Sequence, residues 1–313
     1  MKKIKVGVIG VGNMGKNHAR VYSEIADLVA ISDTNELLGK NVAGKYNAAF
    51  YPDYKKMLQG KKIEAISVVV PTYLHKEVVL ECLKNSIHTL VEKPIAHNLF
   101  DARKMLGWID KYQTTLMVGH IERFNPAVVK LKKIIDQGRL GKIINLLAIR
   151  VGISPPNIHA SDVALDLGIH DVDVFNYLLG KFPDRKKVIK TKLFSRSSAD
   201  ASTLLLEYGS ITGMIQTNWV TPIKIRKLFV SGVEGYAELD YIQQKIILHD
   251  KILHAKFDGS YYQLISLADV PKKEIFISKK EPLKEELKFF LRNRENLNLS
   301  NASDAIEALK IVF

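Results

Sequence analysis

The chain has 313 residues, of which 47% are hydrophobic and 25% are charged, and its 46 basic and 33 acidic residues leave a net charge of +13. This composition is typical of a folded globular protein and excludes a wholly disordered or fibrous chain. The length predicts about two domains, each able to bury a core of its own.

The basic excess is spread along the chain, with +6 in residues 1–120, +1 in 121–180 and +6 in 181–313. Because no basic tail or long lysine run concentrates it, we expect no nucleic-acid partner. Two interpretations remain. The charge either covers an ordinary solvated surface, or it attracts an anionic small substrate.

Targeting and redox signals point to the cytoplasm. The single cysteine, Cys82, excludes an internal disulfide and any site built from several cysteines, so we expect no metal. The basic start of the chain precedes an apolar stretch that glycines interrupt, which we interpret as a strand and a loop rather than a signal peptide. No apolar run is long enough for a transmembrane helix, so no membrane partner is expected.

The first 120 residues alternate short apolar runs with longer amphipathic segments. Strands are predicted at 5–9, 28–32, 65–70, 88–91 and 116–118, and helices at 17–25, 36–46, 76–85 and 100–112. Apolar strands without polar alternation indicate a parallel sheet covered on both faces. We therefore predict a doubly wound α/β domain over residues 1–120.

Beyond residue 120 strands dominate and their spacing becomes that of a meander. Helices are predicted at 125–136, 164–179, 282–292 and 302–311, and strands at 143–151, 203–208, 211–217, 226–231, 236–241 and 245–249. Gly209-Ser210 is a two-residue hairpin signal. Residues 121–313 are thus predicted to form an α+β domain with a large, mainly antiparallel open sheet. The strands between Arg150 and His249 leave an apolar face that its helices cannot cover, and such faces mark interfaces.

A glycine-rich motif follows the first strand and opens the first helix, and it includes Gly10, Gly12, Asn13, Met14 and Gly15. An acidic residue, Asp33, ends the second strand 18 residues later. In this context the motif predicts a dinucleotide site, with the pyrophosphate at the helix N-terminus. Asp33 would accept hydrogen bonds from the ribose hydroxyls and repel a 2′-phosphate, which favours NAD over NADP. The alternative is that Asp33 only caps the next helix.

Two further strand ends place polar residues where a nicotinamide should lie, because ligands of doubly wound sheets bind beyond the carboxyl ends of the strands. The candidate cofactor contacts there are Pro71, Thr72, His75, Glu92 and Lys93. The alternative for Lys93 is a surface lysine at a turn.

A polar stripe is predicted on the helix at 164–179, where Asp166, His170, Asp173 and Tyr177 share one face. The stripe could be a solvated face, or half of a metal site that no second cluster completes. We favour a general base, His170, oriented by Asp166, because alcohol oxidation needs a proton acceptor near neutral pH.

Three motifs together resemble the glucose–fructose oxidoreductase, inositol dehydrogenase and rhizopine catabolism family of oxidoreductases. They are GVIGVGNMG at 7–15, Glu92-Lys93-Pro94, and Asp166 followed four residues later by His170. The resemblance spans essentially the whole chain. It implies a Rossmann domain followed by an open-sheet domain that commonly forms a dimer or tetramer face. It also implies that Lys93 and His170 handle the proton, that Asp166 supports His170, and that the Lys93–Pro94 peptide is cis.

Two more segments, GHIERFNP at 119–126 and NWVTPIKIR at 218–226, resemble nucleotide-sugar dehydrogenases of this family, with UDP-N-acetylglucosamine 3-dehydrogenases as the nearest branch. Such substrates have a diphosphate, which Arg123, Arg150, Lys224 or Arg226 would bind. The alternative is that these residues build the sheet and a subunit contact. The expected substrate-binding set is Lys93, Arg123, Asn125, Arg150, Asp166 and His170.

The function expected from these features is NAD-dependent oxidation of a sugar ring hydroxyl, most specifically C3 of a UDP-N-acetylhexosamine or its uronic acid, by a homodimer or homotetramer. One alternative is an inositol or free-sugar dehydrogenase. The other is a non-catalytic NAD-binding sensor, against which the joint presence of Lys93, Asp166 and His170 speaks.

Overall fold

The computed structural model describes residues 3–60, 62–153, 162–194, 198–250, 271–297 and 301–313. The chain divides into two compact units. The first comprises Met1–Phe124 and Glu281–Lys310, and the second comprises Asn125–Lys280 and Ile311–Phe313.

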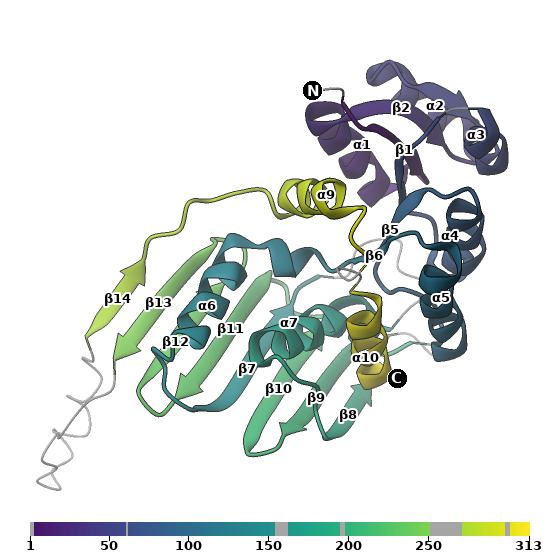
Figure 1. Ribbon diagram of the computed structural model, residues 1–313. Helices are drawn as coiled ribbons and strands as arrows, with labels where there is room; N and C mark the ends of the chain where they lie inside the picture. The colour runs from purple at the N-terminus through teal and green to yellow at the C-terminus, as the bar shows by residue number, and fades with distance from the viewer. Residues whose placement is uncertain (1–2, 61, 154–161, 195–197, 251–270, 298–300) are drawn as a thin grey trace, which may run out of the picture. The chain divides into compact units, whose positions relative to one another are not determined.

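The first unit is built on a parallel sheet with strand order β3-β2-β1-β4-β5-β6 (Figure 1). Its strands are β1 (Lys5–Ile9), β2 (Asp27–Ser32), β3 (Ala49–Tyr51), β4 (Ala65–Val68), β5 (His88–Glu92) and β6 (Leu116–Gly119). Every neighbouring pair runs parallel. β4 and β6 are buried along their whole length, as expected for strands covered on both faces. The predicted Rossmann-type sheet is confirmed.

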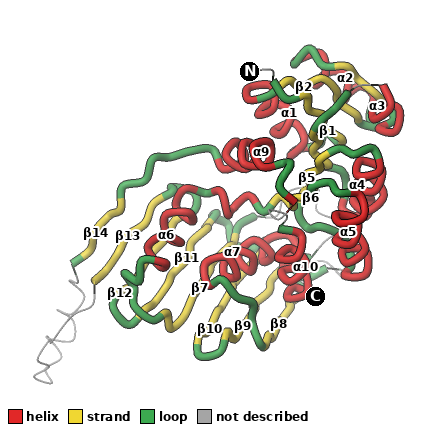
Figure 2. The backbone as a smooth tube through the Cα atoms, viewed as in Figure 1, coloured by secondary structure: helices red, strands yellow, loops and turns green. Residues whose placement is uncertain are grey.

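Helices connect these strands and cover the sheet, as the tube in Figure 2 shows. They are α1 (Asn13–Ile25), α2 (Glu36–Lys45), α3 (Tyr54–Gly60), α4 (His75–Lys84) and α5 (Leu99–Tyr112), with short 3-10 turns η1 (Thr72–Leu74) and η2 (Ile121–Phe124).

Two helices near the end of the chain also belong to this unit. They are α9 (Pro282–Asn293) and all but the last residues of α10 (Ala302–Val312). The apolar face of α9, with Leu283, Leu287 and Phe290, joins the hydrophobic core of β1 and α1. The division predicted at residue 120 places this helix in the second domain. Helical periodicity marks an apolar face but does not say which core buries it.

The second unit is an eight-stranded sheet of order β14-β13-β12-β11-β7-β10-β9-β8. Its strands are β7 (Ile143–Val151), β8 (Arg185–Thr191), β9 (Ala201–Tyr208), β10 (Ile211–Asn218), β11 (Ile225–Gly232), β12 (Gly235–Asp240), β13 (Lys245–Asp250) and β14 (Lys272–Ile275). All neighbours are antiparallel except β7 and β10, which are parallel. The mainly antiparallel open sheet is confirmed, and Gly209 turns the β9–β10 hairpin at φ +65°.

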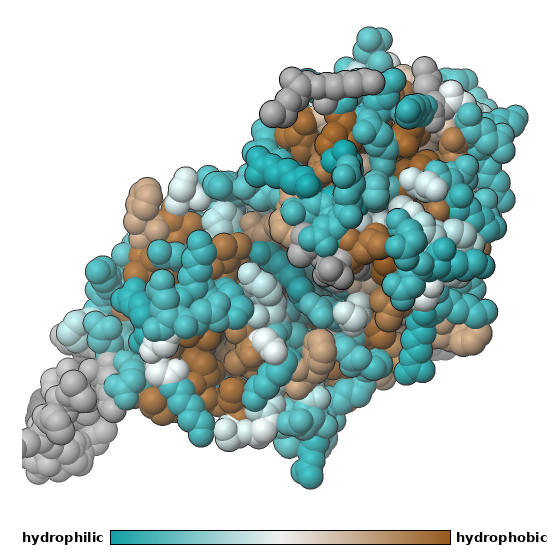
Figure 3. Space-filling view, viewed as in Figure 1, coloured by the Kyte–Doolittle hydropathy of each residue, from teal (hydrophilic) through white to brown (hydrophobic). Residues whose placement is uncertain are grey.

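One face of this sheet packs against α6 (Pro126–Asp136) and α7 (Ile169–Leu179), which lie over it in Figure 1. Figure 3 views the molecule from that side and shows hydrophilic side chains over most of the surface, with hydrophobic patches between them. Alternate residues of each strand point to the helices and are buried, such as Leu204, Leu206, Ile215, Leu228, Val230 and Leu239.

The opposite face is less apolar than predicted. Strand register places Leu205, Met214, Leu147 and Phe229 side by side in one row across four strands. Leu205 and Met214 are about two-fifths exposed, at 40% and 39%. A neighbouring row is mixed, since it pairs Thr203 and Gln216 with Ile149 and Lys227. The face therefore holds one apolar row with polar side chains beside it.

Candidate active site

The glycine loop joins β1 to α1 at the carboxyl edge of the parallel sheet. Gly10 has φ +85°, and a Cβ there would lie 2.5 Å from the carbonyl oxygen of Val69. A Cβ on Gly15 would lie 1.9 Å from the carbonyl oxygen of Gly10. Both glycines are thus required by the loop itself, one for its left-handed turn and one for close packing.

Gly12 is different, because a Cβ there would meet no atom within 4 Å. It is the N-cap of α1, receives no side-chain cap, and is followed by the exposed Asn13 and half-buried Met14. The first turn of α1 holds no acidic residue. An exposed helix N-terminus with open space beside it fits the pyrophosphate of a dinucleotide.

Asp33 lies just after β2 and holds the glycine loop in place. Its Oδ2 accepts the backbone N–H of Val11 at 2.7 Å, and its Oδ1 accepts that of Asn35 at 2.8 Å. Asn35, rather than Asp33, caps α2, because its side chain accepts the N–H of Leu38 at 3.0 Å. Each carboxylate oxygen keeps a further lone pair, so the carboxylate can still accept ribose hydroxyls. These residues fit NAD.

The residues after β4 divide into two groups. Pro71 is exposed and Thr72 half-buried in the η1 turn, where both remain open to a ligand. His75 is only 1% exposed, with Nδ1 3.0 Å from the carbonyl oxygen of Pro94 and Nε2 3.0 Å from that of Val70. Burial lowers the pKa of His75 despite these two carbonyl contacts. The side chain predicted to contact the cofactor instead ties two strand ends together.

Glu92 is the last residue of β5 and Lys93 follows it, next to the loop that follows β4. Glu92 is 9% exposed, and its Oε1 lies 2.9 Å from His18 Nε2 while its Oε2 accepts the N–H of Lys93 at 3.1 Å. Burial raises the pKa of Glu92, but the hydrogen bond and charge of His18 outweigh it and hold this pKa below its usual value. Lys93 is half-buried, and the Lys93–Pro94 peptide is cis, as the resemblance implies.

His18 and Ser67 were missed by the sequence reasoning. His18 Nδ1 lies 3.0 Å from Ser67 Oγ, which is 2.8 Å from the hydroxyl of Tyr22. All three side chains are fully buried. The available signal was a serine inside an otherwise apolar central strand and a histidine four residues before a tyrosine on one helix face, since buried polar groups need partners.

In the second unit, Asp166 and His170 lie on one continuous helical segment. It begins with a π-helical turn, η3 (Ala164–Gly168), and continues as α7. Asp166, His170 and Tyr177 are half-buried, whereas Asp173 is buried at 1% exposure. The structure therefore alters the predicted α-helical stripe at two places: a wider turn separates Asp166 from His170, and Asp173 is buried. π turns inside helices are frequent at functional sites.

Arg150, predicted to bind substrate, is 4% exposed and held by a carboxylate of its own unit. Its Nε lies 2.6 Å from Asp171 Oδ2 and its second amino group 3.0 Å from Oδ1. The hydroxyl of Tyr241 donates to the same Oδ1 at 3.0 Å, and the guanidinium carbon lies over the Tyr241 ring, 4.8 Å from its centroid. This buried cluster joins β7, α7 and the turn after β12.

Most of the other residues predicted to bind substrate also have partners within the protein. Asn125 is buried, caps α6 through the N–H of Ala127 at 3.1 Å, and donates to the carbonyl of Tyr241 at 3.1 Å. Arg123 pairs with Asp304 at 2.9 Å, and Arg226 donates to the backbone carbonyl of Ile225 at 2.8 Å. Lys224 is exposed between β10 and β11. Three of the four basic residues predicted to bind a substrate diphosphate therefore have structural partners, and Lys224 is the exception.

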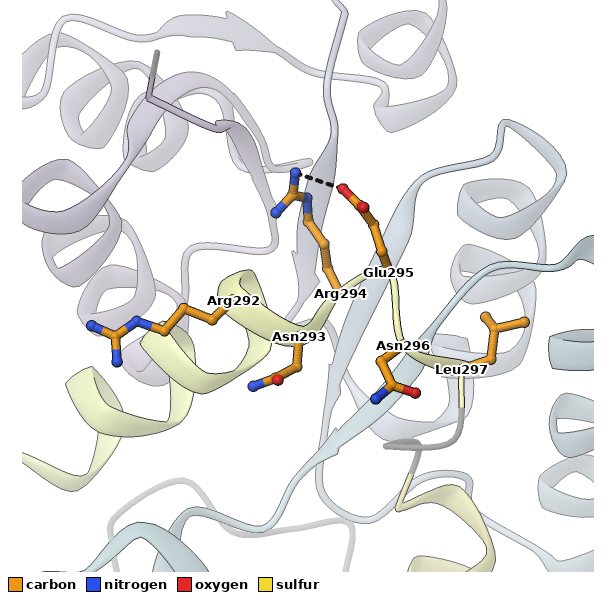
Figure 4. A pocket seen from close by; sticks show the side chains of 6 residues that line it. All are labelled: Arg292, Asn293, Arg294, Glu295, Asn296 and Leu297. Atoms are coloured by element: carbon orange, nitrogen blue, oxygen red, sulfur yellow. Dashed lines mark ion pairs between the residues drawn. The ribbon is translucent and has the colours of Figure 1, made fainter. Parts of the chain in front are cut away.

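A hollow at the end of α9 lies away from this edge of the sheet. Arg292–Leu297 line it, and Figure 4 shows the ion pair between Arg294 and Glu295, which are 3.0 Å apart. Arg294 also borders a hollow formed with Glu64 and His88, which stand at the amino ends of β4 and β5. Ligands of doubly wound sheets bind at the carboxyl edge, so we exclude both hollows from the candidate site.

Within the described part of the chain, no group of three or more His, Cys, Asp and Glu side chains could hold a metal ion. A search of the same residues finds no helix with the length and apolar character needed to cross a membrane.

Comparison with known proteins gives two family matches. Residues 4–120 match the "Oxidoreductase family, NAD-binding Rossmann fold" and residues 128–238 the "GFO/IDH/MocA C-terminal domain". The chain is 27% identical over 252 residues to UDP-N-acetylglucosamine 3-dehydrogenase of Acidithiobacillus ferrooxidans, covering 80% of this chain and 78% of the relative. It is 28% identical over 219 residues to myo-inositol 2-dehydrogenase of Thermotoga maritima, covering 66% of each.

A solved structure of UDP-N-acetylglucosamine 3-dehydrogenase GnnA from Acidithiobacillus ferrooxidans superposes with a TM-score of 0.86 at 22% identity, over 100% of this chain and 96% of that chain. At this identity the likeness shows the shared fold.

Proposed function

The chain belongs to the GFO/IDH/MocA family of NAD-binding oxidoreductases, and from that premise we propose that it transfers hydride from a sugar ring hydroxyl to NAD, at C3 of a UDP-N-acetylhexosamine or its uronic acid. The observation that supports a dehydrogenase most directly is the position of Lys93. It directly follows β5 at the same sheet edge as the glycine loop and Asp33, where a nicotinamide binds in doubly wound folds.

The cofactor contacts follow from the first unit. Gly10, Gly12 and Gly15 shape the loop for a pyrophosphate, and Asp33 binds the adenosine ribose. NAD, when bound, supplies the hydride acceptor. Preference for NAD over NADP is supported by the half-buried Asp33 carboxylate and by the uncharged neighbours Thr34 and Asn35, which offer a 2′-phosphate no cation.

The proton of the oxidised hydroxyl goes to His170 in this proposal. Neutral imidazole accepts it, and Asp166 four residues earlier stabilises the imidazolium that forms. Lys93 donates a hydrogen bond to the same oxygen as negative charge develops there. The half-buried state of Lys93, His170 and Asp166 supports these roles, because each group is partly screened from water yet open to a ligand.

The nucleotide part of the substrate rests on the relative with that activity. Lys224 is the exposed cation left for a diphosphate, since Arg150, Arg123 and Arg226 have partners within their own units. Because these three arginines already have partners, a second candidate substrate is an uncharged polyol, such as the one named for the Thermotoga relative. An NAD-binding sensor remains the non-enzymatic alternative.

One assay distinguishes the nucleotide-sugar dehydrogenase, the polyol dehydrogenase and the NAD-binding sensor. Purified protein is mixed with NAD and, in turn, UDP-N-acetylglucosamine, its uronic acid, UDP-glucose, myo-inositol and free hexoses, and NADH is followed by its ultraviolet absorbance. We expect turnover with UDP-N-acetylglucosamine or its uronic acid. Turnover with inositol or free hexoses alone would support the second candidate. Tight NAD binding without turnover of any compound would support a sensor.

We also propose that the open sheet face pairs with a second copy of this chain to form a homodimer or homotetramer. The central row of Leu205, Met214, Leu147 and Phe229 supplies an apolar contact. Lys227 and Glu238 on neighbouring strands supply opposite charges beside it, so the face is suited to a two-fold related copy. The cytoplasm is the compartment that the lone Cys82 favours.

A further inference from the structure

We propose that His18 is a positioning residue for Lys93, acting through the buried carboxylate of Glu92. The inference rests on the catalytic role proposed for Lys93. His18 is 0% exposed, so it cannot touch a substrate or cofactor, and any effect on the reaction must pass through the groups that it contacts.

The hydrogen bonds around His18 link the side chains of Tyr22, Ser67 and His18 to Glu92. The Glu92 carboxylate only accepts, so His18 Nε2, at 2.9 Å, is the donor. Ser67 Oγ can then donate to Nδ1 at 3.0 Å and accept from the Tyr22 hydroxyl at 2.8 Å. Burial raises the pKa of Tyr22, so this hydroxyl stays protonated and able to donate. Each side chain of this hydrogen-bonded series therefore has a partner inside the protein.

Glu92 has little freedom to leave this arrangement. Its second oxygen accepts the backbone N–H of Lys93 at 3.1 Å. A Cβ on Gly119 of the neighbouring strand would lie 3.3 Å from both carboxylate oxygens, so a larger residue there would crowd the carboxylate. The pKa of Glu92 is lowered, because His18 and the charge of Lys93 outweigh burial. The carboxylate is therefore ionised at neutral pH and depends on its partners.

A second buried histidine holds the other side of Lys93. His75, at the start of α4, lies 3.0 Å from the carbonyl oxygen of Pro94 and 3.0 Å from that of Val70. The residues before and after Lys93 are thus both held by histidines, one from α1 and one from α4. A reactive side chain needs such support, since a displacement of about 1 Å can cost about 10²-fold in rate.

The test compares two substitutions of one residue. His18→Asn can still reach Ser67 but not Glu92, whereas His18→Gln places an amide donor near the position of Nε2. We expect His18→Asn to lower kcat by about 10- to 10²-fold and to leave KM for NAD unchanged, because the glycine loop and Asp33 are untouched. His18→Gln should recover most of the lost kcat. Tyr22→Phe is the control. It removes only the hydroxyl that contacts Ser67, at the end of the hydrogen-bonded series farthest from Glu92, and should retain kcat.

Amide hydrogen exchange of the peptide spanning residues 88–95 provides a readout that needs no substrate. Exchange should be faster in His18→Asn than in the wild type and should return toward the wild-type rate in His18→Gln. Unchanged kcat and exchange in a folded His18→Asn would overturn the inference, as would equal loss in both variants or a loss confined to KM for NAD. If the wild type itself turns over no compound, the proposed function fails, whereas exchange still decides whether His18 holds this segment.

Discussion

Replacing Arg150 by methionine separates a structural role from a substrate contact. The guanidinium makes two hydrogen bonds to Asp171, at 2.6 and 3.0 Å, with side-chain exposures of 5% and 1%. Methionine fills much of the same volume without charge. The variant leaves the Asp171 carboxylate buried with the Tyr241 hydroxyl as a remaining donor.

The expected cost follows from this burial. Removing one partner of a buried ion pair costs about 3–5 kcal/mol, because the other charge stays without compensation. The retained Tyr241 bond places Arg150→Met near the lower end, at about 3 kcal/mol. In an Asp171→Asn background the same substitution should cost about 1–3 kcal/mol less, since no carboxylate charge is then left behind.

The free energy of unfolding is measured by urea titration with tryptophan fluorescence, in a Trp108→Phe background. The remaining tryptophan, Trp219, lies in the second unit and reports on that unit alone. Arg185→Met is the control. Its pair with Glu207 spans 3.9 Å with exposures of 82% and 56%, and it should cost less than about 0.5 kcal/mol. An Arg150→Met protein of unchanged stability but with raised KM for a nucleotide sugar would refute the reasoning and restore the predicted substrate contact.

Three other outcomes are expected. Asp33→Ser combined with Thr34→Arg should shift preference from NAD to NADP, and equal wild-type affinity for both cofactors by calorimetric titration would defeat the assignment. His170→Ala should lose about 10²–10⁴ in turnover while NAD affinity stays, and Lys93→Met should be at least as damaging; near-full turnover of His170→Ala would make Lys93 the base. Light scattering at micromolar concentration should show a dimer or tetramer that Phe229→Glu dissociates, and a wild-type monomer would exclude this assembly.

Local signals predicted the cofactor half of the molecule well. The glycine loop, the acidic end of the second strand and the Glu92-Lys93-Pro94 turn each follow a short apolar run, so their spacing from these runs predicts that they lie at strand ends. The alternation of apolar runs likewise predicted the parallel sheet, because strands buried on both faces need no polar residues.

Partners distant in the chain account for what the sequence could not show. His18 and Glu92 are 74 residues apart, and Tyr241 reaches Asp171 across 70 residues. An arginine such as Arg150 looks the same in sequence whether it binds a phosphate or a buried carboxylate. Helical periodicity also did not reveal the π turn at 164–168, or that α9 packs in the first core.

The central claim is hydride transfer from C3 of a UDP-N-acetylhexosamine to NAD. Its most direct test is incubation of the protein with NAD and UDP-N-acetylglucosamine deuterated at C3, followed by NMR of the recovered nicotinamide. We predict deuterium at C4 of the reduced nicotinamide together with a 3-keto sugar. Reduced cofactor without deuterium, or labelled sugar recovered intact while another compound of the panel is oxidised, would contradict the claim.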